Sequence, residues 1–592
     1  MARKAIGERA SDYHDEWRQR LQHSHDYWRD NGLTPNQRRR PWEIDGFRYL
    51  DFYRGDQWGG RGWGVFTPDQ CITVNVTAAN TNAMLSRLSK NNPKVICTPT
   101  RAGAQESARI RRNELVLQYF VRELQMKRQV DRALLDALLT PFGFMQHGYS
   151  APDDKFQAGT GRELDSYSMA RAGLPWIKRR PFWDVRVDPL ADTFSPDGSA
   201  SWVAFRDLLS MRQIKGSKRL SFPDDLKPTK SVDLFEKKRQ RRSDTTPEWY
   251  DLFEVWTLYE KTEKKWFSLS PGSSKFLMEP AEWPIPWETL PFSYLSFNEQ
   301  ADSNIPVPFP SLYESQQVEL NKVRTIMSSL SKGQRRMLFY QRDSFIDADQ
   351  KKLDAGELDL REVFAVQGSP RDAVYEVGLG GFSQELLLYD AKIKEDIREA
   401  IGLSQMDRAQ RVNVETAAES NAIQLGSATQ AGRNEEKFEA FWRHILQTFR
   451  QELRYTLSSD VLVSVAGEKD AQSLSEDGSF VAVTREDVQG DYDLDIRAGS
   501  TLPENHNERF AKTLQLKQIF TGDATVDQLE LTSVLIEEAG FDSSRLVRSP
   551  EQLVATEQEL QARGQGGPPG GSGQSKTDGL DANFLRQLGV TQ

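Results

Sequence analysis

The sequence predicts an α+β fold, in which helices and strands follow one another in irregular order. Short apolar and aromatic runs such as Gly143–Tyr149 and Ser201–Arg206 lie between turn residues, which is typical of strands. Longer segments such as Gly103–Leu139 repeat apolar residues at helical spacing. Because these segments do not alternate as βαβ units, we do not expect a regular parallel sheet.

The first part of the chain is predicted to open with a polar helix and to continue as mixed helix and strand. Residues 1–40 place Tyr13, Trp17, Leu21 and Trp28 on roughly one helical face and end near Asn31-Gly32. Aromatic residues between Trp42 and Phe66 are interpreted as a wall between packed elements rather than as a base-stacking surface. The other predicted elements are strands at Lys94–Arg101, Gly143–Tyr149, Trp176–Asp188 and Ser201–Arg206, a short helix at Met211–Gly216, and a hairpin of Tyr250–Lys261 with Lys265–Ser270.

A group of prolines from Pro280 to Pro310 is expected to prevent regular structure and to mark a boundary. After it, Ser311–Gly333 has the spacing of a long helix, and Ser311 with Glu314 has the pattern of a capping box. The later predicted elements are strands at Met337–Tyr340, Ser344–Ile346, Leu360–Val366, Ala373–Val377, Val461–Val465, Phe480–Thr484 and Tyr492–Ala498, and helices from Ser383 to a stop at Gly402, over Glu415–Leu457, Glu504–Ile519, Asp527–Ala539 and Pro550–Arg563.

The segment Glu415–Leu457 is predicted to be a very long helix, interrupted near Gly426 and Gly432. Its first half carries small residues at near-helical spacing, which allow helices to approach closely in a crowded bundle or ring: Ala418, Ala422, Gly426 and Ala428. Its second half is strongly amphipathic through Phe438, Phe441, Trp442, Ile445, Leu446, Phe449 and Leu453.

Composition and charge restrict the class of protein. Among 592 residues, 77 Lys and Arg stand against 86 Asp and Glu, a net charge of −9, which excludes a generally basic nucleic-acid coat. From Gly467 to Gln592 there are 22 acidic and 11 basic residues, a net of −11, so the rest of the chain is about +2. The two cysteines, Cys71 and Cys97, exclude a disulfide scaffold and are expected to be buried thiols. With no signal-peptide core and no apolar run of membrane-spanning length, an intracellular origin without a membrane span is expected.

No enzyme signature is found in the sequence. It contains no GxxxxGK[ST] phosphate loop, no HExxH and no GxSxG. His14, His23 and His25 are expected on an exposed helix, with a spacing that does not suit a metal site, and His147 and His444 are expected to be core residues. We predict no cofactor and no bound metal.

Three aspartates leave one enzyme alternative open. Asp491, Asp493 and Asp495 alternate along a predicted strand, so all three lie on one face. Such a row would suit a divalent cation, and a metal-dependent nuclease is therefore the alternative. An exposed acidic strand face explains the same pattern equally well.

The order of elements from about Pro310 to Leu457 resembles the stem–clip–stem core of portal proteins, the head–tail connectors of tailed bacteriophages. The stretches Ile397–Gln405 (IREAIGLSQ) and Glu415–Gln430 (ETAAESNAIQLGSATQ) are similar to those of short-tailed phage portals, and Phe182–Ala191 (FWDVRVDPLA) is similar to their wing strands. The resemblance covers residues from Trp42 to about Ala539. It implies a portal fold with these parts: an N-terminal arm (1–41), a wing (42–310), stem helix 1 (311–333), a clip (334–381), stem helix 2 (382–401), a channel loop (402–414), a long kinked helix with returning wing strands (415–500), crown helices (501–563), and a Gly-rich linker with a C-terminal tail (564–592).

The resemblance also implies a function without catalysis. A homo-oligomeric ring, a dodecamer in this family, would be assembled in the host bacterial cytoplasm and would occupy the portal vertex of the virion capsid. Double-stranded DNA would pass through its channel without sequence specificity during packaging and ejection. The implied protein partners are terminase, the major capsid protein and scaffold, and head–tail adaptor or tail proteins. The remaining alternative is another head–tail adaptor or tail structural protein, which would lack the stem–clip–stem order.

Two sets of residues are the candidate functional residues under this interpretation. The bases expected near the DNA channel are Lys332, Arg335 and Arg336 at the stem–clip junction and Arg408 and Arg411 in the channel loop. Pairing of these bases with the acids of Glu385–Glu399 in a neighbouring subunit is an equally open alternative. The small residues Ala418, Ala422, Gly426 and Ala428 are expected to pack helices between subunits.

Overall fold

A computed structural model describes the greater part of the chain. The described residues are 2–30, 42–59, 62–89, 93, 95–99, 104–150, 175–228, 252–301, 304–333, 337–340, 374–377, 384–402, 417–456, 461–464, 480–483 and 492–496, with a few helical residues between 514 and 535. The chain divides into two compact units, Met1–Pro503 and Glu504–Gln592. Nearly everything described below belongs to the first unit.

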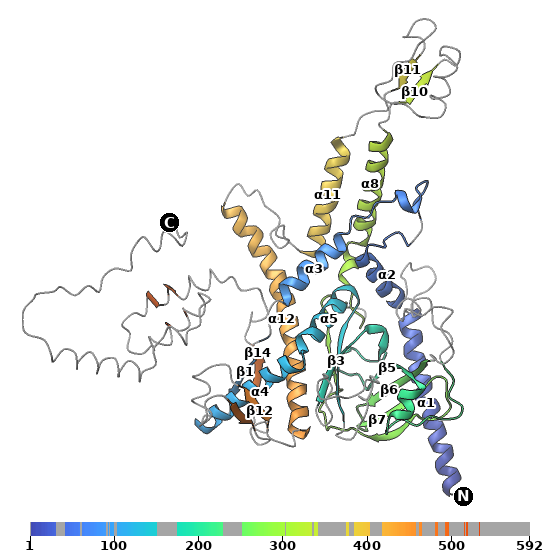
Figure 1. The fold of residues 1–592 in the computed structure, drawn as a ribbon, viewed down its shortest axis with the longest axis vertical. Coiled ribbons are helices and arrows are strands. Elements are labelled where there is room, and N and C mark those ends of the chain that lie inside the picture. The colour runs from blue at the N-terminus through green and yellow to red at the C-terminus, as the bar shows by residue number, and fades with distance from the viewer. Residues whose placement is uncertain are drawn as a thin grey trace, which may run out of the picture. The chain divides into compact units, whose positions relative to one another are not determined.

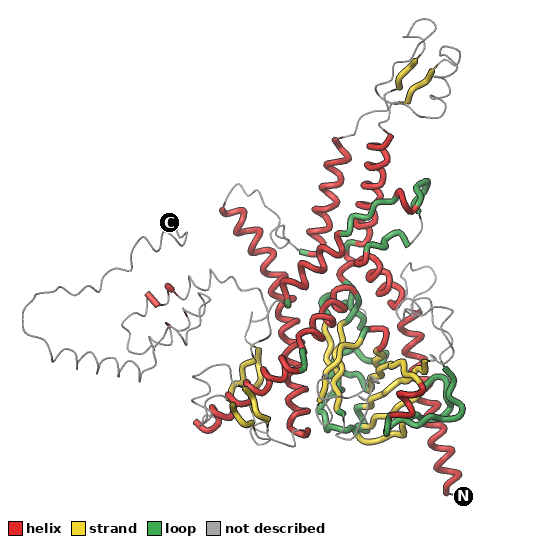
Figure 2. Tube along the Cα trace, viewed as in Figure 1, coloured by secondary structure: helices red, strands yellow, loops and turns green. Residues whose placement is uncertain are grey.

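The first unit is an α+β structure, as the sequence predicts, and helices and strands both contribute extensively to it (Figure 2). Its helices are α1 (Ala2–Asp30), α2 (Trp42–Arg54), α3 (Val76–Leu88), α4 (Ala104–Glu123), α5 (Met126–Leu139), α6 (Met211–Gly216), α8 (Glu314–Gly333), α11 (Gln384–Ile401) and α12 (Ala417–Thr456). Its strands are β1 (Val95–Pro99), β2 (Gly143–Tyr149), β3 (Pro175–Arg180), β4 (Val185–Val187), β5 (Trp202–Ser210), β6 (Leu252–Glu260), β7 (Lys265–Leu269), β8 (Met278–Glu282), β9 (Phe292–Leu295), β10 (Met337–Tyr340), β11 (Val374–Val377), β12 (Val461–Ser464), β13 (Phe480–Val483) and β14 (Tyr492–Ile496).

The pairs among the described strands are all antiparallel. The larger sheet has the order β4-β5-β6-β7-β8, and a second sheet has the order β3-β2-β9. The remaining strands form the pairs β1–β14, β10–β11 and β12–β13. The absence of parallel pairs among the described strands agrees with the irregular order of elements in the sequence.

The five-stranded sheet is covered on both faces, which explains why β5 begins with four consecutive buried residues. On one face, Trp17 and Leu21 of α1 pack against Trp202 and Phe267. On the other face, Val203 and Phe205 belong to an aromatic cluster that also contains Trp28 of α1. Helix α1 is therefore part of the core, and the three apolar residues predicted on its face are buried with Tyr13 partly buried beside them.

The largest core cluster joins α5, α8, α11 and the second half of α12. All seven apolar residues predicted for that half of α12 are buried, from Phe438 to Leu453. Helix α5 packs directly on β2, and its apolar residues Val130, Leu134 and Leu138 are buried as the helical spacing predicts. The amphipathic pattern thus identified the helices that build this core.

Several predictions about single elements were wrong. The helix predicted over Gly103–Leu139 is two helices, because Gln125 has a left-handed backbone (φ 48°) that separates α4 from α5. The strand predicted over Trp176–Asp188 is broken by a 3₁₀ turn at Phe182–Asp184. The interruption expected near Gly426 and Gly432 is not found, since α12 is continuous through both.

The proline-rich segment also departs from the prediction. It contains the strands β8 and β9, and Pro280 lies inside β8, the edge strand of its sheet, where its missing N–H does not break a ladder. A 3₁₀ turn at Phe309–Leu312 delays the start of α8 to Glu314, so the predicted capping box does not form. The Ser311 hydroxyl instead donates to the carbonyl of Pro308 at 2.7 Å.

Two further predictions concern single side chains. His14 is buried and lies edge-on against Phe276, rather than on an exposed helix face. Cys97 is buried as expected, and burial raises the pKa of its thiol to about 12, whereas Cys71 is only half-buried. The strands predicted at Ser344–Ile346 and Leu360–Val366 and the helix at Pro550–Arg563 lie outside the described residues, and the helices at Glu504–Ile519 and Asp527–Ala539 are described at only a few helical positions.

Replacing Gly143 by alanine is expected to lower the free energy of unfolding by about 2–3 kcal/mol, because core residues cannot move apart freely. A Cβ at Gly143 would lie 2.0 Å from the carbonyl oxygen of Ala133, so α5 and β2 would have to separate. Gly432→Ala is the matched control, since a Cβ there meets nothing within 4 Å, and a helical alanine is expected to add about 1 kcal/mol. Urea unfolding followed by circular dichroism measures both. Equal midpoints for Gly143→Ala and wild type would contradict the close packing of α5 on β2.

Candidate functional site: the α8–α11 helix pair

Helices α8 and α11 form an antiparallel pair that extends away from the sheets (Figure 1). Their contact is apolar: Leu320, Val323 and Met327 of α8 are buried, as are Ile393, Ile397 and Ile401 of α11. The chain between the two helices contains the β10–β11 ladder, in which Met337 pairs with Val377 and Tyr340 with Val374. At the other end, α11 stops at Gly402, whose φ of 63° suits the glycine C-cap that the sequence predicts.

Charged side chains join the two helices beside this apolar contact. Asp390 of α11 is almost fully buried and accepts hydrogen bonds from Arg324 of α8 at 2.8 Å and from Lys394 at 2.9 Å. The Tyr389 hydroxyl donates to the Glu319 carboxylate on α8, and this hydrogen bond raises the pKa of Tyr389. These contacts fix the register of the two helices, because each connects one position of α8 with one position of α11.

The inner face of α8 carries a polar ladder that sequence analysis missed. Gln317, Asn321 and Thr325 are spaced four residues apart and are all buried. The extended segment 71–75 runs along them. Its backbone is satisfied by side chains of the ladder: Thr325 accepts from Ile72 N and Asn321 from Val74 N, both at 2.9 Å, and Gln317 donates to Val74 O at 2.8 Å. The ladder replaces a neighbouring strand for this segment and attaches the base of the helix pair to the body.

The distal part of the pair exposes large apolar side chains. Leu388 is 66% exposed, Leu387 50%, and Tyr389 and Leu330 are each 45% exposed. We call these four residues the apolar surface of the helix pair. Leu330 lies near the end of α8 and the other three near the start of α11, so in an antiparallel pair they belong to the same end. Grouped apolar residues of this kind are typical of an interaction surface.

One of the predicted channel bases lies at the same end of the helix pair, and the other four lie outside the described residues. Lys332 lies in the last turn of α8, and its side chain is not described. Arg335, Arg336, Arg408 and Arg411 lie outside the described residues.

The predicted packing residues and the alternative acidic partners can also be located. Ala418, Ala422, Gly426 and Ala428 lie within α12, as predicted, and their side chains are likewise not described. Among the acids considered as partners for the channel bases, Asp390 is paired with Arg324, and Glu395 and Asp396 are paired with Lys392 of the same helix.

No family model and no curated protein matches this chain. Among the described residues, no helix is long and apolar enough to cross a membrane. Nor does the described part of the chain contain a group of three or more His, Cys, Asp and Glu side chains arranged to hold a metal ion. Of the three predicted alternating aspartates, Asp493 and Asp495 lie in β14 opposite Thr98 and Ile96, and Asp491 is outside the described residues.

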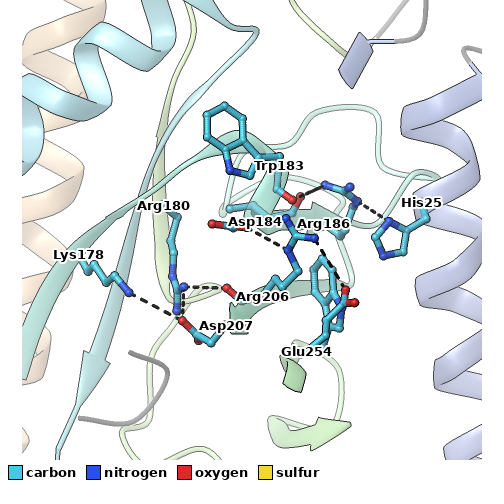
Figure 3. Close-up of polar contacts among 11 residues, drawn as sticks. His25, Lys178, Arg180, Trp183, Asp184, Arg186, Arg206, Asp207 and Glu254 are labelled. Atoms are coloured by element: carbon cyan, nitrogen blue, oxygen red, sulfur yellow. Dashed lines mark hydrogen bonds and ion pairs between the residues drawn. The ribbon is translucent and has the colours of Figure 1, made fainter. Parts of the chain in front are cut away.

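A second polar cluster joins the two sheets and is drawn in Figure 3. Arg180 of β3 binds both carboxylate oxygens of Asp207 on β5, at 2.6 and 2.8 Å, and also donates to Gln146 on β2 at 2.6 Å. Arg206, the neighbour of Asp207, binds Asp184 at 2.9 Å. Burial opposes the charge of Arg180, but Asp207 and Asp184 together raise its pKa, so it remains a cation. The paired charges hold the sheets together, and the cluster presents no unpaired nucleophile or base.

Helix α1 takes part in the same cluster. Arg186 of β4 donates to the carbonyl of Val185 at 2.9 Å and lies 3.3 Å from His25 Nδ1 (Figure 3). Its guanidinium also lies over the ring of Trp28, at 5.5 Å from the ring centroid. His25 is therefore engaged in packing α1 on the sheet.

A third cluster contains the two histidines predicted to be core residues. Ser293 Oγ of β9 lies 2.9 Å from His147 Nε2 and 2.7 Å from His444 Nδ1, and Glu452 lies 3.6 Å from His147 Nδ1. Burial lowers the pKa of His147 to about 3 and that of His444 to about 4, and it raises the pKa of Glu452 well above its usual value. An adjacent cavity of about 220 Å³ is lined by His444 but not by Ser293, which is fully buried. His147 and His444 are thus uncharged at neutral pH, burial disfavours the charged form of Glu452, and the cluster joins α12 to β2 and β9.

Proposed function

We propose that this chain is a structural portal protein, which assembles into a ring at the capsid vertex of a tailed bacteriophage. The observation that carries the proposal is the antiparallel α8–α11 pair, with the β10–β11 ladder between its helices in the sequence and the 40-residue helix α12 after it. This order supports assignment of α8 and α11 as stem helices, of the intervening segment as the clip, and of the sheets as the wing.

The apolar surface of the helix pair supports an assembly of identical subunits. Leu387 and Leu388 are exposed in one copy, although each would gain from burial against another helix pair. A closed ring places the same contact between every pair of neighbours. Double-stranded DNA would pass through the ring with weak contacts, since tight binding of phosphates would arrest its movement. Terminase, capsid and scaffold proteins, and adaptor or tail proteins are the protein partners of this proposal.

Leu388→Glu is expected to prevent ring formation without unfolding the chain. The side chain is 66% exposed in one copy, so a charge is tolerated there, whereas a buried charge between subunits has a large desolvation cost. Mass photometry and negative-stain electron microscopy of purified protein measure the assembly. Wild type should form rings with a central bore and flared wings.

The matched control is Leu190→Glu, which places the same charge on an 84% exposed leucine of the turn between β4 and β5. We expect this variant to assemble like wild type. Wild-type protein that stays monomeric at every salt concentration would overturn the proposal. Oligomers without a bore would instead favour an adaptor or tail protein.

A further inference from the structure

The bend between α4 and α5 forms an open basic groove. The left-handed backbone of Gln125 changes the direction of the chain between α4 and α5. As a result, the last turn of α4 and the first two turns of α5 line one cavity of about 540 Å³. Arg122 comes from α4, and Arg128 and Arg132 come from α5. Arg128 and Arg132 are four residues apart and therefore lie on the same face of α5.

The charges of this groove do not cancel. Its lining contains Arg122, Lys127, Arg128 and Arg132 against the single carboxylate of Asp131, a net of 4 − 1 = +3. Lys127 binds Asp131 at 2.9 Å and the carbonyl of Ser89 at 2.9 Å, so these two opposite charges neutralise each other. Arg122 and Arg128 are exposed, and neither has a carboxylate partner within the described part of the chain.

Arg132 is the third arginine of the groove. The nearby carboxylate of Asp136 is already bound by two nitrogens of Arg179, so Arg132 affects it only at longer range. Three guanidinium groups therefore remain to receive an anion. They form a local positive site in a chain whose net charge is −9.

We propose that this groove binds the phosphate backbone of double-stranded DNA without sequence specificity. Guanidinium groups match phosphate oxygens in geometry and remain charged at all relevant pH values. The only apolar residue of the lining is Val121, which is buried, so the groove lacks the apolar anchor on which peptide binding usually depends. The lining has no aromatic residue on which an unpaired base could stack, which favours a duplex over a single strand. The inference goes beyond the proposed function, since it concerns α4 and α5 and does not require a ring.

The test is fluorescence anisotropy of a labelled 30-base-pair duplex of arbitrary sequence, titrated with the full chain at several salt concentrations. For Arg122→Gln/Arg128→Gln, the slope of log K against log salt concentration should fall by about 2, with at least a roughly tenfold loss of affinity near 0.1 M salt. Arg212→Gln/Lys275→Gln is the matched control, because it removes two exposed cations from other parts of the body with the same change of net charge. It should bind like wild type. Arg122→Lys/Arg128→Lys should retain the slope.

Three results would overturn the proposal. One is an unchanged slope in the glutamine variant, and another is an equal loss in the control variant. The third is an equal loss of affinity for labelled polyglutamate, which would assign the groove to an acidic protein partner. Mass photometry of the same samples separates this test from that of the portal proposal: loss of slope in monomeric protein supports the groove alone, and rings with an unchanged slope support the portal alone.

Discussion

Asp207→Ala is expected to lower the free energy of unfolding by about 3–5 kcal/mol, the usual cost of removing one partner from a buried ion pair. Arg180 is 2% exposed, and Asp207 accepts two of its hydrogen bonds. Without that carboxylate the guanidinium keeps its contact with Gln146 but stays buried with its charge poorly compensated. Chemical unfolding of the variant and wild type at pH 7 measures the difference.

Two control variants identify the cause of this loss. Arg180→Met/Asp207→Leu removes both charges and is expected to recover part of the loss, since a buried pair replaced by apolar side chains often has a small net effect. Lys392→Ala removes an exposed cation paired with Glu395 and should leave the unfolding midpoint unchanged. A loss below about 1 kcal/mol for Asp207→Ala would mean that water reaches the pair, contrary to the burial seen here.

The same pair illustrates what the sequence could not predict. Three consecutive basic residues, Lys178, Arg179 and Arg180, are usually exposed to solvent, but Arg180 is buried by partners on β5. Those partners lie more than twenty residues away, and no local pattern indicates them. The polar ladder of α8 is a similar case, because Gln317, Asn321 and Thr325 bind a segment about 250 residues earlier.

Periodicity predicted the elements that depend on local sequence. The second half of α12 was predicted correctly because one apolar face defines it, and the β6–β7 hairpin because two aromatic-rich runs are separated by a short polar turn. The sequence also contains a pattern that indicates the apolar surface of the helix pair. Leu386, Leu387, Leu388 and Tyr389 are consecutive in α11, and a helix buries only one face, so some had to be exposed: Leu386 packs on the core and the other three are exposed.

His147→Gln and Glu452→Gln are expected to change the pH dependence of stability in opposite directions. The folded-state pKa of His147 is about 3, below its ordinary value of 6.5, so its contribution to stability is complete above pH 6.5 and is lost as the pH falls towards 3. Between pH 6.5 and 4.5 this loss amounts to about 2 kcal/mol, because the slope rises from half of about 1.4 kcal/mol per pH unit at pH 6.5 to its full value near pH 5. His147→Gln should therefore lose less stability than wild type over this interval, by about that amount.

Glu452 has the opposite sign because burial raises its pKa well above 4.5 in the folded state. Its contribution is complete below pH 4.5 and is lost as the pH rises, so acidification from pH 6.5 to 4.5 stabilises wild type through this group. Glu452→Gln keeps an oxygen that can accept the 3.0 Å hydrogen bond from Trp287 but removes the titration, and it should lose more stability than wild type over the same interval. The pKa of His444 is lowered mainly by burial, which all three proteins share, and to a lesser extent by His147, so the His147→Gln curve also contains a smaller change at His444. Urea unfolding at pH 6.5, 5.5 and 4.5 gives the three curves. Parallel curves would contradict the opposite pKa shifts of the buried His147–Glu452 contact. Divergence on either side of wild type would show that α12 is joined to β2 through two groups whose charged forms are disfavoured by burial.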